Sequence, residues 1–345
     1  MRILLIKMSS MGDVFHTFPA LTDAMQNQPG LVVDWVVEEA FQEIPKWHPV
    51  VDQVYSIRLR QWRKHPIRFR QEIKAFFERV NQTHYDLVID AQGLLKSAWV
   101  VSKIKEPIAG MDWGSAREKL ASLFYQHKYP VAKHQHAISR LRELFARVLD
   151  YPLPAKETLD YHLATQAWQK LPQLADDYMV FLHGTTWDTK LWPEAYWIEL
   201  LNRVVAQGKQ VVLPWGNEEE KQRAKRIAKT VESDHTPSGI KAWVPNQKLD
   251  LNTMACCLKF AKAVVSVDTG LSHVAAALDV PMVVIYRVTD PDLVGALGNK
   301  VRYVVSPLAK HYLKSFAPGD EDESKRGIQV TDVCRALEGI ASGKS

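Results

Sequence analysis

Two strand–loop–helix segments, one near each end of the chain, constrain its fold most. The first is the apolar run Arg2–Ile6 followed by the loop Lys7–Asp13, and the second is Ala263–Val265 followed by the loop Ser266–His273. Both loops contain a glycine and an aspartate and lead into helix-like sequence. In open α/β sheets, ligands bind beside such loops, at the carboxyl ends of the strands. The two loops therefore predict two nucleotide-binding-type halves that face one cleft, with one substrate on each half.

Short β-branched runs alternate with longer amphipathic stretches along both halves. This alternation favours βαβ units and parallel sheets, so we expect an α/β fold with two Rossmann-like domains. The expected strands are Ile3–Ile6, Val32–Val37, Gln53–Ile57, Leu87–Asp90, Tyr178–His183, Gln210–Leu213, Ala263–Val267 and Met282–Tyr286. The expected helices are Phe15–Gln26, Phe41–Trp47, Ile67–Val80, Leu94–Ile104, Ala116–Tyr125, Ala137–Leu149, Pro193–Ala206, Glu218–Val231, Leu251–Phe260, Leu271–Leu278 and Val330–Ile340.

The alternation breaks at Tyr151–Pro154, and the polar stretch that continues to Asp177 is interpreted as a linker. We therefore expect a first domain over residues 1–165 and a second over 166–325. The stretch Lys310–Arg326 is expected to be loop-like. The last segment, 326–345, is expected to be helical and is a candidate for packing back on the first domain. A length of 345 residues suits two domains of ordinary size.

Composition narrows the class of protein. The net charge of +5 suits an anionic partner, although charge alone is weak evidence. Three cysteines without a CxxC spacing argue against a disulfide framework and for a reducing cytoplasm. The apolar run at the N terminus stops at Ile6, and no stretch reaches the roughly 18 apolar residues of a membrane span. His134 and His136 lack a neighbouring carboxylate, and no metal is assigned. We expect a cytoplasmic protein that can still touch a membrane surface.

Asp13 allows two interpretations. An aspartate at a strand-to-helix turn suits a helix N-cap, because its carboxylate accepts backbone N–H groups. However, Gly12 permits close approach of a ligand to the backbone, and Lys7, Ser9 and Ser10 make the loop polar. In that setting the Asp13 carboxylate suits a general base that acts on a hydroxyl. The residues alone leave both interpretations open.

Two loops of the second half suit a diphosphate. The segment Asp268–Gly270 precedes an expected helix, whose N terminus offers free N–H groups and the positive end of the helix dipole. The segment His183–Lys190 adds two adjacent threonines and a lysine. Each loop alone also fits an ordinary polar turn, and together they favour anion binding. The chain has neither a GxxxxGK[ST] loop nor a GxGxxG fingerprint after its first strand.

A basic segment spans Arg58–Arg79, with eight basic residues and only Glu72 and Glu78 opposing them. Apolar residues at helical spacing within it predict an amphipathic helix with a solvated basic face. The part before that helix, Arg58–Lys64, is expected to be a flexible loop. It suits a phosphorylated or carboxylated substrate or an anionic lipid surface.

Taken in order, these motifs resemble glycosyltransferase family 9. The match covers nearly the whole chain, and the ordered set is specific although each piece is weak. The matching segments are Lys7–Asp13 with His16 and Pro19–Leu21, Asp34–Glu39, Asp90–Leu94, Gly110–Trp113 with Arg117 and Glu118, Leu123–Tyr125, Thr185–Lys190 with Trp192–Glu194, Leu213–Gly216, Val267–His273 and Thr289–Pro291.

The resemblance implies a GT-B fold, in which two Rossmann-like domains face an interdomain cleft. It implies an inverting transfer of L-glycero-D-manno-heptose from ADP-heptose to the Kdo residue of Kdo2-lipid A, a step of lipopolysaccharide inner-core synthesis. The N-terminal domain would bind the acceptor and the C-terminal domain the nucleotide sugar. The resemblance implies no cofactor and no nucleic-acid partner. It places the protein at the cytoplasmic face of the inner membrane, as a peripheral protein on an anionic surface.

The resemblance also assigns roles by position. Asp13 is the expected general base, and Lys190 is expected to stabilise the leaving ADP. The expected donor site consists of Thr185, Thr186, Lys190, Glu220, Leu249, Asp268, Thr269, Gly270 and His273. The expected acceptor site consists of Ser10, Gly12, Arg60, Arg63 and Arg117.

The chain departs from the family pattern at two places. Arg287 and Val288 stand where the family often has Gly-Pro, and Gln61 stands where an arginine is common. Three other functions stay open. They are another family 9 heptosyltransferase with a later core acceptor, a sugar-nucleotide epimerase, and a basic nucleic-acid-binding module, which would leave the two loops unexplained.

Overall fold

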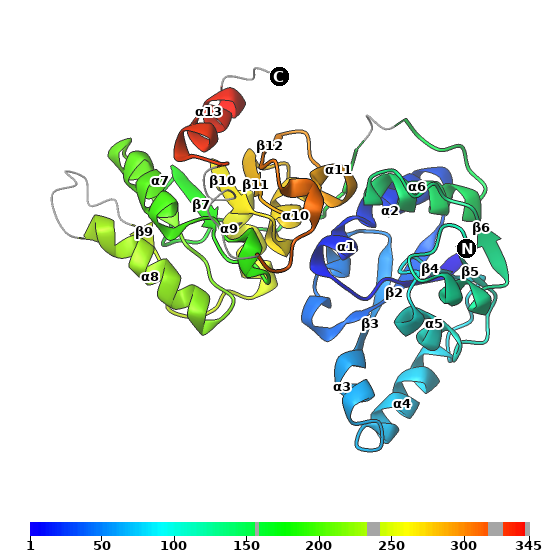
Figure 1. The fold of residues 1–345 in the computed structure, drawn as a ribbon. Coiled ribbons are helices and arrows are strands. Elements are labelled where there is room, and N and C mark those ends of the chain that lie inside the picture. The colour runs from blue at the N-terminus through cyan, green and yellow to red at the C-terminus, as the bar shows by residue number, and fades with distance from the viewer. Residues whose placement is uncertain (156–158, 233–241, 317–326, 342–345) are drawn as a thin grey trace. The chain divides into compact units, whose positions relative to one another are not determined.

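The computed structural model describes residues 1–155, 159–232, 242–316 and 327–341 (Figure 1). The chain divides into two compact units, Met1–Gln166 and Ala167–Ser345. This boundary lies one residue from the one expected between 165 and 166. Each unit contains a six-stranded parallel sheet with helices packed against it.

The first unit has strand order β3-β2-β1-β4-β5-β6, and every neighbouring pair is parallel. This is the order of a Rossmann domain, with its topological switch point between β1 and β4. The strands are β1 (Arg2–Ile6), β2 (Val32–Glu38), β3 (Val51–Ile57), β4 (Leu87–Asp90), β5 (Ile108–Met111) and β6 (His127–Tyr129). The α-helices are α1 (Met11–Phe15), α2 (Phe18–Asn27), α3 (Leu59–Lys64), α4 (Arg70–Val80), α5 (Leu95–Val101) and α6 (Ala137–Val148).

The second unit repeats this topology, although the sequence shows no internal repeat. Its order is β12-β11-β10-β7-β8-β9, again parallel throughout, with the switch point between β7 and β10. The strands are β7 (Tyr178–Leu182), β8 (Gln210–Val212), β9 (Ala242–Trp243), β10 (Ala263–Val267), β11 (Met282–Tyr286) and β12 (Val301–Val305). The helices are α7 (Glu194–Ala206), α8 (Glu218–Glu232), α9 (Leu251–Lys259), α10 (Gly270–Ala277), α11 (Pro291–Val294) and α13 (Val330–Ala341).

Continuous apolar runs explain why the central strands lie inside each unit. Residues 3–6 of β1 are fully buried, and all five residues of β7 and of β11 are buried. A strand covered by helices on both faces needs apolar side chains on both faces, so it shows no alternation. Because the central strands are buried, the loops that follow them at the two switch points are held in place.

Several helices differ from the sequence prediction. The helix expected over Phe15–Gln26 begins only at Phe18, as α2, and the separate short helix α1 ends at Phe15. The two are not continuous, because Pro19 lacks the N–H that would bond back to the preceding turn. The helix expected over Ala116–Tyr125 is a 3-10 helix, η3, that spans Lys119–Phe124. The helix expected over Phe41–Trp47 is replaced by two 3-10 turns, Glu39–Phe41 and Pro45–Trp47.

The basic segment before α4 also differs from the prediction. Instead of a flexible loop, residues Leu59–Lys64 form helix α3. Glu72 of α4 accepts hydrogen bonds from the Arg58 guanidinium, one of them at 3.0 Å, and from the Trp62 indole at 2.8 Å. Trp62 is buried. These contacts stabilise a helix where the local sequence suggested a flexible loop, so the expectation of a loop was wrong.

The sequence prediction missed the short strands β5, β6, β9 and β12. The last helix, α13, packs on β11, β12 and α7 and belongs to the second unit, where the prediction considered packing on the first domain. The loop expected over Lys310–Arg326 lies outside the described residues from position 317 onward. Its first residues are the end of the 3-10 helix Ala309–His311.

Candidate functional site

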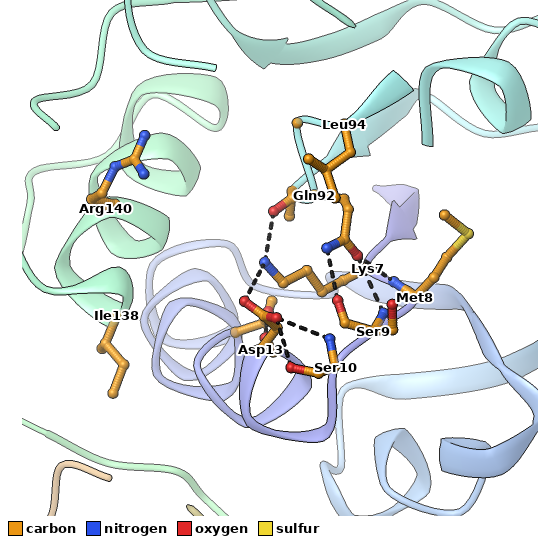
Figure 2. A network of polar contacts seen from close by, with 12 residues as sticks. Lys7, Met8, Ser9, Ser10, Asp13, Gln92, Leu94, Ile138 and Arg140 are labelled. Carbon is orange, nitrogen blue, oxygen red and sulfur yellow. Dashed lines mark hydrogen bonds and ion pairs between the residues drawn. The ribbon is translucent and has the colours of Figure 1, made fainter. Parts of the chain in front are cut away.

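The loop after β1 holds the Asp13 carboxylate in a fixed orientation (Figure 2). Ser10 is the N-cap of α1, and its backbone N–H and hydroxyl both donate to Asp13 Oδ2 at 2.9 Å. Asp13 itself occupies the third helical position, so it is not the N-cap that one interpretation expected. Gly12, beside it, is buried in the first turn of α1. Because Ser10 occupies Oδ2, the second oxygen is the one turned toward Lys7.

Lys7 and Asp13 form the electrostatic centre of this loop. The Lys7 ammonium lies 3.8 Å from Asp13 Oδ1 and donates to the Ala91 carbonyl at 3.0 Å. Burial lowers the pKa of Lys7. Burial alone would raise the pKa of Asp13, but the charges of Lys7 and His16 and the bonds from Ser10 outweigh it and lower that pKa to about 2. The carboxylate is therefore ionised at every physiological pH.

The loop after β4 positions the Asp13 loop, a role that the sequence analysis did not assign. The Gln92 amide oxygen accepts from the N–H groups of Met8 at 2.9 Å and Ser9 at 3.2 Å, and its nitrogen donates to the Ser9 carbonyl at 2.7 Å (Figure 2). This side chain therefore pairs with the backbone as a neighbouring strand would. The match of Asp90–Leu94 to the family pattern was the one signal in the sequence.

Asp90 in turn supports Gln92. Its carboxylate accepts from the Gln92 and Gly93 N–H groups and from the Tyr125 hydroxyl at 2.7 Å. Burial raises the pKa of Asp90. A Cβ on Gly110 would lie 2.5 Å from the Tyr125 ring, so only glycine there lets the ring pack against β5. The hydrogen bonds that run from Tyr125 through Asp90 to Gln92 thus hold the loops after β1 and β4 together.

Basic side chains gather around the Asp13 loop. Lys96 of α5 donates to the Ser9 hydroxyl at 2.6 Å. Arg140 of α6 donates to the Ser115 carbonyl at 2.6 Å, and the charges of Arg117 and Arg140 both act on Lys7. Arg117 is exposed. Lys96 and Arg140 were missed, because nothing in their local sequence connects them to β1.

The two other expected acceptor residues lie on α3. Arg60 and Arg63 are both exposed. The Glu38 carboxylate, at the end of β2, accepts from the N–H groups of Leu59 and Arg60. This fixes the start of α3 at the carboxyl edge of the sheet. The two arginine side chains project into solvent, without a described contact to Asp13.

In the second unit, the loops after β7 and β10 meet through Asp268. Lys190 Nζ lies 2.7 Å from Asp268 Oδ2, and the Thr289 hydroxyl donates to the same oxygen at 2.6 Å. The Thr185 hydroxyl donates to the Asp268 carbonyl at 2.9 Å. Lys190 also lies over the Trp187 ring, 4.5 Å from its centroid. The arrangement fixes a lysine ammonium beside the carboxyl end of β10.

Helix α10 starts at the same place. Thr269 is its N-cap and Gly270 its first residue, so the helix begins two residues after Asp268, the partner of Lys190. The Ser272 hydroxyl donates to the Thr269 carbonyl, and His273 is buried in the helix. A helix N terminus beside a lysine is suited to an anion such as a diphosphate.

The remaining expected donor residues lie around this centre. A Cβ on Gly184 would lie 2.5 Å from the carboxyl carbon of Glu220, so that carboxylate rests directly on the loop after β7. Its other contact is the Gly216 N–H, at 2.6 Å. Thr186 is exposed, and Leu249 is half-buried just before α9. The structure thus groups Glu220 with the β7 loop and places Leu249 on a separate loop.

The departure at Arg287 has a structural role. The buried guanidinium of Arg287 donates to the Leu191 carbonyl and lies over the Phe316 ring, 5.6 Å from its centroid. Leu191 directly follows Lys190. Arg287 therefore anchors the segment that carries the lysine, which a glycine at this position could not do.

Comparisons with known proteins agree with this arrangement. A model of the family described as glycosyltransferase family 9 (heptosyltransferase) matches residues 73–317. Lipopolysaccharide heptosyltransferase 1 of Pseudomonas aeruginosa is 49% identical over 334 residues, with 93% of this chain and 90% of that protein covered. Lipopolysaccharide heptosyltransferase 1 of Escherichia coli strain K12 is 48% identical over 304 residues, with 87% and 92% covered.

A solved structure, the E. coli heptosyltransferase WaaC with ADP, has a TM-score of 0.86 and 43% identity to this chain, covering 99% of this chain and 100% of that one. The two Rossmann-like units, taken together with this likeness and the family match, place the chain in the GT-B class of glycosyltransferases. The chain belongs to glycosyltransferase family 9, the heptosyltransferases. The resemblance found in the sequence and the expected fold class are thereby confirmed.

Proposed function

We propose that the chain transfers L-glycero-D-manno-heptose from ADP-heptose to the Kdo residue of Kdo2-lipid A, with inversion, in lipopolysaccharide inner-core synthesis. The observation that carries the proposal is an ionised carboxylate, Asp13, at one switch point and a lysine, Lys190, beside a helix N terminus at the other. The relatives support heptose transfer to lipopolysaccharide, because those of P. aeruginosa and E. coli K12 are named lipopolysaccharide heptosyltransferase 1. A solved relative contains ADP-2-deoxy-2-fluoro heptose, at a TM-score of 0.84.

On the acceptor side, Asp13 accepts the proton of a Kdo hydroxyl as that oxygen attacks the anomeric carbon. A carboxylate with a pKa of about 2 is a weak base toward a free alcohol. The hydroxyl becomes acidic only as its bond to carbon forms, so proton transfer accompanies the attack. Ser10 and Lys7 hold the carboxylate so that no reorientation is needed in the transition state.

On the donor side, the leaving ADP gains negative charge as the glycosidic bond breaks. Lys190, the hydroxyls of Thr185 and Thr186, and the first turn of α10 are the groups that stabilise this charge. Asp268 keeps Lys190 in place when the site is empty. When the diphosphate binds, the lysine is shared between the carboxylate and the phosphate oxygens.

The acceptor is an amphipathic lipid, so the proposal includes peripheral contact with an anionic membrane at the cytoplasmic face of the inner membrane. The exposed arginines of α3, Arg60 and Arg63, suit the anionic groups of such a surface. Within the described residues, none of the helices combines the length and the apolar character needed to cross a bilayer.

The first test is ADP release from the purified protein with ADP-heptose, with and without Kdo2-lipid A. We expect acceptor-dependent release, and the Asp13→Ala variant should lose at least about a hundredfold in kcat, the factor that general base catalysis supplies. The Asp13→Ala variant should keep its affinity for ADP-heptose, since Asp13 and Lys190 belong to different units. Release only with an already heptosylated acceptor would make the chain a later transferase of the family. Absence of both turnover and ADP-heptose binding would contradict the donor assignment.

A further inference from the structure

Helices α5 and η3 of the first unit contact each other and together expose a group of large apolar side chains, here called the α5–η3 surface. The exposed fractions of these residues range from 37% to 62%. The surface consists of Leu95 and Trp99 on α5 and of Leu120, Leu123 and Phe124 on η3. Contiguous exposed apolar patches of this kind mark protein–protein or membrane interaction sites.

The orientation of η3 is opposite to that of an ordinary surface helix. Its small residues, Ala121 and Ser122, are buried, while its three large apolar side chains point to solvent. The backbone beneath is held firmly, because the Tyr125 hydroxyl donates to buried Asp90 directly after η3. On α5, the Trp99 ring packs edge-to-face on Phe77, 5.6 Å between centroids. The apolar side chains are therefore presented by an ordered surface.

The charge of the chain segment that carries this surface favours an anionic lipid bilayer over an uncharged partner. Residues 95–133 contain seven basic side chains against three acidic ones. The basic residues are Lys96, Lys103, Lys105, Arg117, Lys119, Lys128 and Lys133, and the acidic ones are Glu106, Asp112 and Glu118. Apolar area and basic charge together give stable attachment to a membrane surface, where either alone is marginal. Tryptophan, as at Trp99, is the side chain that prefers the bilayer interface.

The same helix turn also reaches the Asp13 loop. Lys96 donates to the Ser9 hydroxyl, while its neighbour Leu95 is exposed on the α5–η3 surface. A lipid with an anionic sugar head and acyl chains can therefore place its head at Lys96 while its chains stay in a bilayer that α5 touches.

We propose that the α5–η3 surface inserts into the interface of an anionic bilayer and thereby presents the Asp13 loop to a membrane-bound acceptor. The second half of this statement rests on the proposed function. Bilayer binding itself does not require turnover, and the two can be tested separately.

The test is flotation of the full-length protein with vesicles of phosphatidylglycerol and phosphatidylcholine, and with phosphatidylcholine alone. We expect the double variant Leu123→Glu/Phe124→Glu to bind the anionic vesicles at least about tenfold more weakly than the wild type, because two large apolar groups leave the interface. The matched control is Leu153→Glu/Leu293→Glu, which adds the same charge at two exposed leucines elsewhere and should bind as the wild type does. The neutral pair Leu123→Ala/Phe124→Ala should show a smaller loss, which separates the apolar contribution from charge repulsion.

Equal binding by the η3 variant and the control variant would overturn the proposal. It would equally be overturned if the wild type were a dimer that the η3 substitutions dissociate while vesicle binding stays the same. Turnover with a water-soluble, deacylated acceptor should be unchanged in the η3 variant. If the wild type turned over no acceptor at all, the proposed function would fail, and the vesicle result would still decide the membrane surface.

Discussion

At the scale of single residues, the pKa of Asp13 depends on Lys7. The carboxylate is buried enough that desolvation favours its neutral form, and the ammonium at 3.8 Å is the largest opposing influence. A lowered pKa in the folded state stabilises the fold above the ordinary aspartate pKa of about 3.9. That contribution is lost as the pH falls from about 4 toward 2.

Replacing Lys7 by methionine removes the charge and leaves the burial, so the pKa of Asp13 should rise. We expect an acid limb to enter the kcat/KM profile above pH 4, where the wild type, with an Asp13 pKa of about 2, shows none. The measurement is the pH–rate profile from pH 4 to 9. Lys46→Met serves as the control, because Lys46 is exposed and pairs with surface Glu43 at 2.8 Å. A profile unmoved by Lys7→Met would mean that other groups set the basicity of Asp13.

At the scale of elements, the position of α3 depends on one carboxylate. Glu72 of α4 holds both Arg58 and Trp62, the residues at the start and in the middle of the α3 segment. Without it, the six-residue helix has little intrinsic stability, since isolated helices shorter than about 12 residues are marginal in water.

We therefore expect Glu72→Ala to open α3 locally and to speed tryptic cleavage after Arg60 and Arg63 several-fold, while the rest of the unit stays folded. Mass spectrometry of early digestion products provides the measurement. Glu78→Ala is the matched control on the same helix, because Glu78 pairs with exposed Lys74 at 3.5 Å. Equal cleavage rates in the two variants would show that Glu72 does not hold α3.

At the scale of the whole molecule, each unit has its own apolar core, so the chain should unfold in two steps rather than one. ADP binds the second unit in the proposed function, and it should raise only one of the two transition temperatures.

The first unit contains a buried ion pair, and breaking it should show which of the two unfolding transitions belongs to that unit. Arg142 of α6 donates to Asp23 of α2 at 2.6 Å, with both side chains almost fully buried. Arg142→Leu leaves the aspartate charge unpaired, at a cost of about 3–5 kcal/mol, and should lower the transition that ADP does not affect by roughly 10 °C. Calorimetry with and without ADP measures this. Arg203→Leu, which breaks an exposed pair with Glu199, should move neither transition appreciably. A single transition that shifts as a whole would argue against independent units.

The two-unit α/β fold and the loops at which the polar sites lie could be predicted from the sequence. Apolar runs such as Ile3–Ile6 have to be buried on both faces, and the polar residues directly after them then fall at the carboxyl edge of a parallel sheet. Asp13, Lys190 and Asp268 could be named because each lies in the segment that directly follows such a strand.

The distant side chains that complete these loops could not be predicted, because they are brought there by tertiary contacts. Gln92, Lys96 and Arg140 reach the Asp13 loop, or act on its lysine, because β1 and β4 are neighbours and α5 and α6 pack against the same sheet. The helix at Leu59–Lys64 likewise forms through Glu72, which lies outside it. A local sequence pattern gives no information on strand order or on contacts between segments far apart in sequence. These contacts determine the surroundings of the Asp13 loop and the formation of α3.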